Sequence, residues 1–374
     1  MDEIGKKDVR VFVYEHVATL SQHSMSDLEP EARAMHEALV EDFAAIPELR
    51  VTTILNSDRQ RSFSKLVDVR RCQAVDERSL REIAGECDVA MVIAPESGQV
   101  LSKVCETISR SGWPIFGPML EWVEVFSDKR KTAAHLDELG IETSVDFSTF
   151  EDQTKVVVKP FDGVGCHCVA LCPPEMVQDA VRSIREQGCH DSLIVQPYRS
   201  GTPASVALIC SKSAIDVLPA VEQRIALTDD DRVAGLRWLS YLGGRMPLSV
   251  ELNFRAIRLA ERFAERTPDL LGYIGLDLIL GDDSNGQDDR IVEVNPRLTT
   301  SYLGYRQFIP LAAHFLAAMK DPGSSTTKGL PIIRNRVRQI APDEKQSLAA
   351  KSSTFGTLQF DASGQLEWKN PLES

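Results

Sequence analysis

The sequence predicts an α/β domain with a parallel sheet, followed by an α+β region made of hairpins and helices. Strand and helix patterns alternate through residues 1–117, which is typical of a parallel sheet covered by helices. Beyond residue 118, neighbouring apolar runs are separated by short turns, which favours antiparallel pairing. A chain of 374 residues is long enough for two or three packed units.

In the first region, residues 27–46 carry apolar side chains from Leu28 to Ile46 at intervals of three and four, which is one face of an amphipathic helix. Compact β-branched and apolar runs predict the strands, and helical spacing predicts the remaining helices. The other expected elements are strands at 9–14, 51–55, 88–94 and 115–116, a helix at 76–86, and a further helix before the last strand.

The second region, residues 118–321, begins with a helix over 128–139, and Gly140 suits the position after a helix C-terminus. We expect strands at 155–159, 193–196, 205–210 and 214–218, and a further strand that follows the glycine loop and ends at residue 171. Helices are expected at 173–187 and 249–266, and a hairpin over 272–295. The compact body should end near residues 322–327. Residues 322–374 then form a linker and a C-terminal hairpin with its turn at 361–364.

Composition excludes whole classes of function. A net charge of −13 disfavours non-specific nucleic-acid binding, so an anionic ligand requires local positive groups or a metal. No apolar stretch approaches the roughly 20 residues of a membrane span. The eight cysteines occur without a secretory signal, which predicts reduced thiols and a cytoplasmic protein.

The hairpin over 272–295 carries a candidate metal site. Counting outward from its expected turn at Asn285 places Asp277 opposite Glu293. Glu293 and Asn295 lie two residues apart on one strand, so they face the same side, about 7 Å apart. A solvent-facing polar side is the alternative, but the apolar neighbours indicate buried strands, where carboxylates are costly without a cation. These oxygen ligands suit Mg2+ bound to nucleotide phosphates.

Two lysines and a glycine loop are the second set of candidates. Lys159 ends an apolar strand and is followed by Gly163 and Gly165, which let backbone N–H groups approach phosphate oxygens. Lys129 opens the helix over 128–139. Taken singly, the glycine loop could equally be a plain turn between strands, and Lys129 could be an ordinary surface lysine. The strand end at residues 194–198 precedes a short connection whose backbone could contact an adenine edge, or simply link two strands.

The order and spacing of these motifs, together over residues 120–320, resemble the ATP-grasp superfamily. The resemblance implies a two-subdomain ATP-grasp fold, with a nucleotide lid at about 145–197 and a metal-binding subdomain at about 198–321. It also implies that Lys129 and Lys159 contact ATP phosphates beneath the glycine loop. The remaining implied roles are adenine-side contacts for Gln196 and Tyr198, Mg2+ or Mn2+ ligation by Asp277, Glu293 and Asn295, and a contact of Arg297 with the transferred phosphoryl group.

Within the superfamily, the segments RVFVYEHV, VIAPESG, PAVEQRI and EVNPRLTTSYLGYR look like the tyramine–glutamate ligase branch of methanofuran-type cofactor synthesis. Gln196 departs from the common pattern, because many relatives carry Glu there. The resemblance implies an ADP-forming ligase that activates a carboxylate, such as that of glutamate, and joins it to an aromatic amine. A different ATP-grasp acceptor and a nucleotide-binding regulator without turnover remain alternatives. The oligomeric state, a homodimer included, stays open.

Three other features have two interpretations each. Cys166, Cys168 and Cys172 invite a metal site, but on an extended strand they share one face, as buried small residues do. Glu15 with His16 either lines a cleft at the sheet edge or caps the strand end. Trp238 with Tyr241 either borders an amine pocket or packs in the interior.

Overall fold

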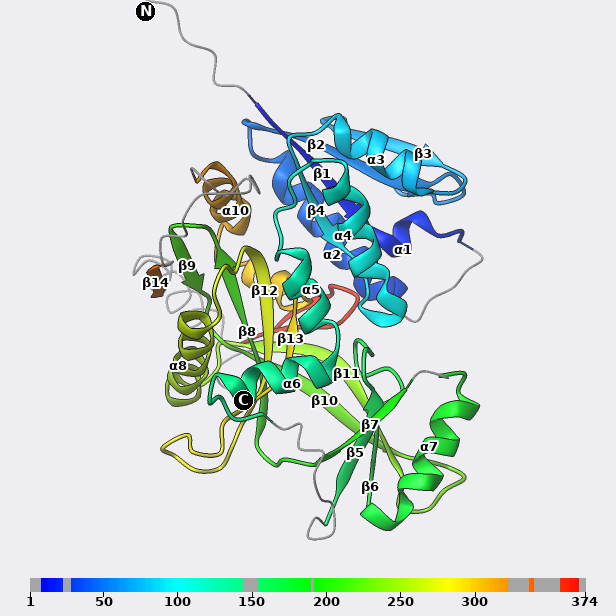
Figure 1. The fold of residues 1–374 in the computed structure, drawn as a ribbon, viewed down its shortest axis with the longest axis vertical. Coiled ribbons are helices and arrows are strands. Elements are labelled where there is room, and N and C mark those ends of the chain that lie inside the picture. Colours follow the sequence, from blue (N-terminus) through cyan, green and yellow to red (C-terminus); the bar gives the residue numbers. More distant parts are fainter. Residues whose placement is uncertain are drawn as a thin grey trace, which may run out of the picture.

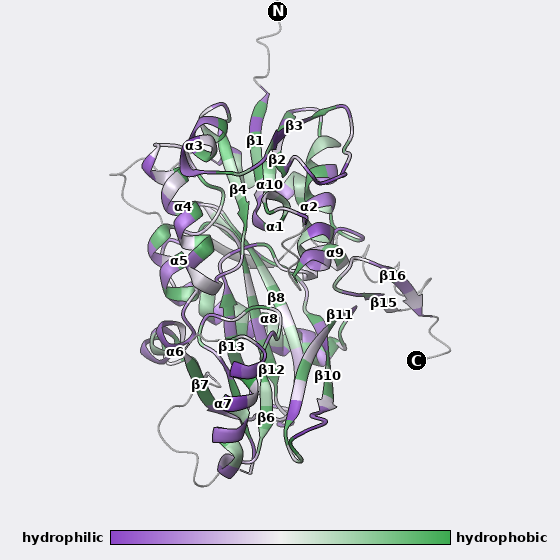
Figure 2. Ribbon diagram, turned by 90° about the vertical axis from the view of Figure 1, so that its right-hand side faces the viewer, coloured by the Kyte–Doolittle hydropathy of each residue, from purple (hydrophilic) through white to green (hydrophobic). Residues whose placement is uncertain are grey.

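The computed structural model describes residues 8–22, 28–143, 154–189, 192–321, 336–339 and 357–369. Figure 1 shows three parts: an N-terminal α/β unit, a large curved sheet in the middle, and a smaller unit of β5, β6, β7 and α7 at the far end. Figure 2 shows that apolar residues concentrate along the inner strands of both sheets. None of the helices in these ranges has the length and apolar content needed to cross a lipid bilayer.

The N-terminal unit is the predicted parallel α/β domain. Its sheet has the order β3-β2-β1-β4, and all three pairings are parallel. The strand β3 was not expected, because it lies at the sheet edge and alternates valine with charged residues. The elements are β1 (Val9–Glu15), α1 (His16–Thr19), α2 (Glu29–Ala44), β2 (Leu49–Asn56), β3 (Val67–Cys72), α3 (Glu77–Gly85), β4 (Val89–Ile93) and α4 (Val100–Arg110).

The second sheet is mainly antiparallel and runs in the order β13-β12-β8-β10-β11-β6-β5-β7. Its long hairpin of β10 and β11 was missed, because charged residues interrupt the apolar alternation and much of it is only half-buried. The strands are β5 (Val156–Pro160), β6 (Ala170–Cys172), β7 (Leu193–Pro197), β8 (Thr202–Cys210), β9 (Ala214–Val217), β10 (Val221–Asp229), β11 (Arg237–Met246), β12 (Gly272–Leu280), β13 (Arg290–Asn295) and β14 (Arg336–Gln339). The helices are α5 (Leu120–Phe126), α6 (Lys129–Glu138), α7 (Val177–Glu186), α8 (Val250–Arg266), α9 (Ser301–Tyr305) and α10 (Leu311–Lys320).

One continuous apolar cluster joins the N-terminal unit to the large sheet. Phe43 on α2 and Tyr302 on α9 both contact Phe315 on α10, with ring centroids 6.0 Å and 6.1 Å away. Tyr302 also donates a hydrogen bond of 2.5 Å to Asp42 on α2. The two units are therefore held together by burial as well as by polar contacts, which fixes the position of α2 over the large sheet.

The C-terminal hairpin is confirmed and belongs to the large sheet. It consists of β15 (Thr357–Phe360) and β16 (Leu366–Lys369), and β15 pairs with β11. Phe360 is 1% exposed. Gly243 on β11 has φ +105°, and a Cβ there would lie 1.9 Å from the Phe360 carbonyl oxygen, so only glycine permits this approach. The expected end of the body at residues 322–327 lies outside the described residues.

The expectation for the cysteines was wrong in its geometry. Cys166 and Cys168 lie in a turn before β6 and have φ angles of +60° and +56°, so they do not share a strand face with Cys172. Cys166 points toward a cavity, whereas Cys168 and Cys172 pack in the apolar cluster beneath α7. In the part of the chain that the structure describes, His, Cys, Asp and Glu do not gather in threes as a metal site.

Candidate active site

A cavity of about 380 Å3 lies between the β5–β7 unit and the large sheet. Every residue that the sequence predicted for the site lines this one cavity, although these residues come from separate strands, helices and loops. They are Lys129, Lys159, Gly163, Gly165, Gln196, Tyr198, Asp277, Glu293, Asn295 and Arg297. Their roles toward a ligand stay predictions, but their convergence in space is what those roles require.

The predicted register of the hairpin of β12 and β13 is correct. Asp277 pairs with Glu293, and a bulge follows between Asp277 and Leu278. Asn295 donates to Asp277 at 3.0 Å, and Gln223 on β10 donates to the other oxygen of Asp277 at 2.8 Å. Sequence reasoning missed Gln223, because β10 carried no strand signal.

The two carboxylates titrate differently. Burial, and then the charge of Glu293, raises the pKa of Asp277 to about 6, against the hydrogen bond from Asn295. Burial alone would raise the pKa of Glu293 too, but Lys129 and Lys159 outweigh it and the pKa falls. Two half-buried carboxylates and the side-chain amide of Asn295, which also carries an oxygen, provide the hard oxygen donors that Mg2+ prefers, so these residues fit the predicted cation.

Both lysines are buried within the cavity wall. Lys129 is placed by the Asp128 side chain, which caps α6, and its ammonium donates to the Gly163 carbonyl at 2.6 Å and to Glu293 at 3.0 Å. Lys159 ends β5 and is 5% exposed. Burial, followed by repulsion from Lys129, lowers the pKa of Lys159 to about 8. The cavity therefore holds closely spaced positive groups that an anionic ligand would stabilise.

The glycine loop lies against the N-terminal unit. Asp162 accepts the backbone N–H of Gly98 at 3.0 Å, and Ser97 donates to the Asp162 carbonyl at 3.0 Å. Gly165 has φ +61°, which favours glycine. These contacts hold the loop over the cavity and close its side toward β4.

Arg297 follows β13 and is anchored by an acid that the sequence did not single out. Its Nε donates to both oxygens of Glu96, at 2.9 Å and 3.0 Å. Burial opposes the charge of Arg297, but Glu96 and then Glu31 outweigh it, and the pKa rises. Glu96 lies three residues after the end of β4, at the carboxyl edge of a parallel sheet, where ligand sites are common. Its position at this sheet edge was the one feature of the sequence that could have marked Glu96 as a site residue.

The opposite end of the cavity is less charged. Gln196 on β7 is 5% exposed, and among the described residues its Oε1 has no hydrogen-bond partner. Tyr198 is 37% exposed at the rim. An unsatisfied buried amide is costly, so a polar ligand group is expected beside Gln196.

The aromatic pair proposed for an amine pocket is split. Tyr241 lines the cavity, near Thr300, which donates to Glu31 of α2 at 2.7 Å. Trp238 instead donates to Asp230 at 2.8 Å and packs against the apolar cluster beneath α7. Glu31 and Thr300 were not predicted, because nothing in the sequence shows that α2 reaches this cavity.

Two family models match parts of this chain. Residues 49–121 match the family model described as the pre ATP-grasp 3 domain, and residues 126–301 match that of the ATP-grasp domain. No curated protein matches the sequence.

Many solved structures share the fold. A protein from Archaeoglobus fulgidus described as an ATP-grasp superfamily member is 18% identical, with a TM-score of 0.61, over 83% of this chain and 89% of its own. The L-amino acid ligase from Bacillus licheniformis is 18% identical, with a TM-score of 0.55, over 84% of this chain and 75% of its own. N5-carboxyaminoimidazole synthase from Aspergillus clavatus was solved with ADP and 5-aminoimidazole ribonucleotide. It is 15% identical, with a TM-score of 0.58, over 94% of this chain and 88% of its own. At these identities the likeness is one of fold.

Proposed function

We propose that this chain, in which residues 49–121 and 126–301 match the pre ATP-grasp and ATP-grasp family models, is an ATP-dependent ligase. It phosphorylates a carboxylate and couples the resulting acyl phosphate to an amine, releasing ADP and phosphate. The observation that carries the proposal is that one cavity gathers two buried lysines, two carboxylates with an amide, and the Arg297 guanidinium.

The metal end of the site fits Asp277, Glu293 and Asn295 as ligands of Mg2+ or Mn2+. A bound divalent cation supplies charge neutralisation for the β- and γ-phosphates. Lys129 and Lys159 bind phosphate oxygens from the other side. This division of labour suits phosphoryl transfer, which depends mainly on positioning and on electrostatic stabilisation.

The remaining contacts orient the nucleotide. The backbone around Gly163 and Gly165 covers the phosphates, and the hydrogen bonds of Asp162 to the 97–98 segment keep that cover in place. The unsatisfied amide oxygen of Gln196 is suited to accept from the amino group of adenine, with Tyr198 at the rim.

The chemistry proceeds in two steps. A substrate carboxylate oxygen bonds to the γ-phosphorus as the bond to ADP breaks, which turns a poor electrophile into an acyl phosphate. An amine nitrogen then attacks the carbonyl carbon, phosphate leaves and one proton is released. Arg297 stabilises the negative charge on the transferred group, and a closed loop limits attack by water.

For the substrates we propose glutamate, or a similar amino acid, and a tyramine-like amine. The motifs shared with the tyramine–glutamate ligase branch support this choice, as does Tyr241 in the cavity wall. The similar fold of an L-amino acid ligase is compatible with an amino-acid carboxylate.

The test is a screen of amino acids paired with amines, with ADP release as the readout and mass spectrometry of the product. With the productive pair, Glu293→Ala and Lys159→Ala should each lower turnover by about a hundredfold or more, on the order of 3 kcal/mol. The control is Lys131→Ala, an exposed lysine on the same helix as Lys129. Wild-type turnover in either active-site variant would contradict the assignment.

The two alternatives give other results in this screen. ADP release with carboxylate or carbonate acceptors, but with no amine, would favour a different ATP-grasp acceptor. Tight ATP binding without ADP under any pair would favour a regulator. The paired carboxylates weigh against a regulator, because a protein that only binds nucleotide has no need of a complete metal donor set.

A further inference from the structure

A second, smaller cavity of about 30 Å3 opens beside the first. It lies between the carboxyl ends of β1 and β4, helix α2 and the glycine loop, and Glu15 lies in its wall. The two cavities share three wall residues: Glu31, Gly165 and Arg297. The side cavity therefore adjoins the place where the proposed acyl phosphate forms.

Resting on the proposed ligase function, we propose that this side cavity receives the primary ammonium group of a substrate, held between Glu15 and Glu31. A volume of 30 Å3 holds a group about as large as a water molecule, which is the size of an ammonium. The rest of such a substrate extends past Arg297 into the main cavity. Carboxylates in the wall disfavour an anion at the same position.

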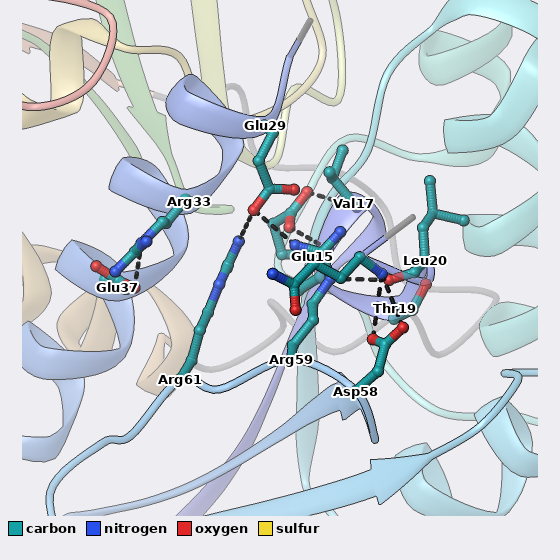
Figure 3. A network of polar contacts seen from close by, with 12 residues as sticks. Glu15, Val17, Thr19, Leu20, Glu29, Arg33, Glu37, Asp58, Arg59 and Arg61 are labelled. Carbon is teal, nitrogen blue, oxygen red and sulfur yellow. Dashed lines mark hydrogen bonds and ion pairs between the residues drawn. The ribbon is translucent and has the colours of Figure 1, made fainter. Parts of the chain in front are cut away.

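Glu15 is a buried carboxylate that forms no ion pair with any residue in the described part of the chain. It is 1% exposed and accepts the backbone N–H groups of Val17 at 2.9 Å and of Ala18 at 2.7 Å. The nearby guanidinium groups of Arg59 and Arg61 each form an ion pair with Glu29, as Figure 3 shows. The charge of Arg61 still lowers the pKa of Glu15, although the two do not form an ion pair. Each carboxylate oxygen can accept a second hydrogen bond. An ammonium would use that capacity and offset the cost of burying the charge.

Glu31 on α2 also lines the side cavity. One oxygen, Oε1, accepts the Thr300 hydroxyl at 2.7 Å. The other, Oε2, lies 3.5 Å from where a Cβ on Gly165 would stand, so it faces the space under the glycine loop. The absence of a side chain at Gly165 leaves that space open. Thr300 thereby orients Glu31 toward the side cavity.

The ionisation of Glu15 supports the inference. Burial raises its pKa to about 7, against the two backbone hydrogen bonds and Arg61. A bound cation favours the ionised form, so the ammonium should bind more tightly as pH rises through 7. The charged groups that act on Glu15 are Arg61, which lowers its pKa, and Glu29, which raises it. Glu31 and Arg297 also line the side cavity, and Tyr14 and His16 adjoin Glu15 in the sequence.

Binding can be measured without turnover by calorimetry, with magnesium and a non-hydrolysable ATP analogue present. The probes are tyramine against its alcohol analogue tyrosol, and L-glutamate against glutarate, which lacks the ammonium. For the ammonium-bearing probe that binds, Glu15→Gln and Glu31→Gln should each weaken affinity at least tenfold and leave its neutral partner unchanged. Glu37→Gln, a surface carboxylate on the same helix α2, is the matched control.

The inference is overturned if wild-type protein does not prefer either ammonium probe to its neutral partner, or if Glu15→Gln binds as wild type. A failure of the ligase proposal looks different. In that case no acid and amine pair releases ADP, while the preference for an ammonium and its dependence on Glu15 remain.

The ammonium has two sources, the attacking amine or the α-ammonium of the acid substrate. Hydroxylamine, which is largely neutral near pH 7, traps the acyl phosphate without needing an ammonium site of its own. If the side cavity serves the attacking amine, Glu15→Gln retains hydroxamate formation and loses amide formation. If it serves the acid, the variant raises the KM for the acid at least tenfold in the trapping assay. Wild-type behaviour in both assays would also overturn the inference.

Discussion

Nucleotide affinity should fall steeply above pH 8, because Lys159 loses its proton there. In the free protein, burial and Lys129 lower the pKa of Lys159 to about 8. Nucleotide phosphates favour the charged ammonium, so above pH 8 binding must first take up a proton. Each further pH unit should therefore weaken binding about tenfold, or about 1.4 kcal/mol, until the pKa of the bound state is reached.

The assay is calorimetric titration with MgADP between pH 7 and 9.5, comparing slopes rather than absolute affinities. Lys159→Arg keeps its charge throughout this range, so its profile should be flat above pH 8. Lys131→Met, the exposed neighbour on α6, should decline like wild type. Cys166 in the same cavity does not interfere, because burial raises the pKa of its thiol to about 12.

Two outcomes would refute this reasoning. Wild-type affinity that is unchanged up to pH 9.5 would mean that Lys159 is not the group that meets the phosphates. An equal decline in Lys159→Arg would assign the titration to another group. Circular dichroism across the same pH range separates either result from unfolding.

Two stability predictions follow from buried contacts. Arg255→Met leaves Asp289 without its ion-pair partner, and the two side chains are only 9% and 7% exposed. The variant should lose about 3–5 kcal/mol of unfolding free energy in chemical denaturation. The control Arg78→Met, at an exposed ion pair, should change that free energy by no more than about 0.5 kcal/mol. Phe360→Ala should cost about 3–5 kcal/mol, because its ring fills the core under β11, while Leu366→Ala on the exposed strand of the same hairpin should cost far less. An unchanged Tm for Phe360→Ala would show that the C-terminal hairpin is not part of the folded body. An unchanged Tm for Arg255→Met would show that the ion pair of Arg255 with Asp289 contributes nothing to stability.

The sequence was sufficient where an interaction is local or follows from counting. The pairing of Asp277 with Glu293 could be predicted because a hairpin fixes its register once the turn is located. The helix over 128–139 and the strand before Lys159 were equally visible, because apolar spacing and caps are local signals.

Other parts of the site could not be predicted, because they depend on contacts across the fold. Glu96 and Arg297 are 201 residues apart, and their ion pair has no local signature. Glu31 reaches the cavity only because α2 packs against α10 through Phe43 and Phe315, within the apolar cluster that joins the two units. The turn at Cys166 depends on positive φ angles at two cysteines, and cysteine is not a residue type that predicts such angles. Tertiary packing decides each of these cases.

The charges of the cavity explain how so polar a site can stay folded without its ligand. Glu293, proposed as a metal ligand, binds Lys129 at 3.0 Å in the free protein, so each compensates the other. When a metal–nucleotide complex binds, Glu293 can exchange Lys129 for the cation, and Lys129 can exchange Glu293 for a phosphate. Neither group is left buried and unpaired at any stage. Among the residues that the structure describes, Lys159 forms no ion pair, and the charges of Glu293 and Asp277 only partly offset its burial. The pKa of Lys159, rather than that of Glu293, should therefore control affinity at high pH.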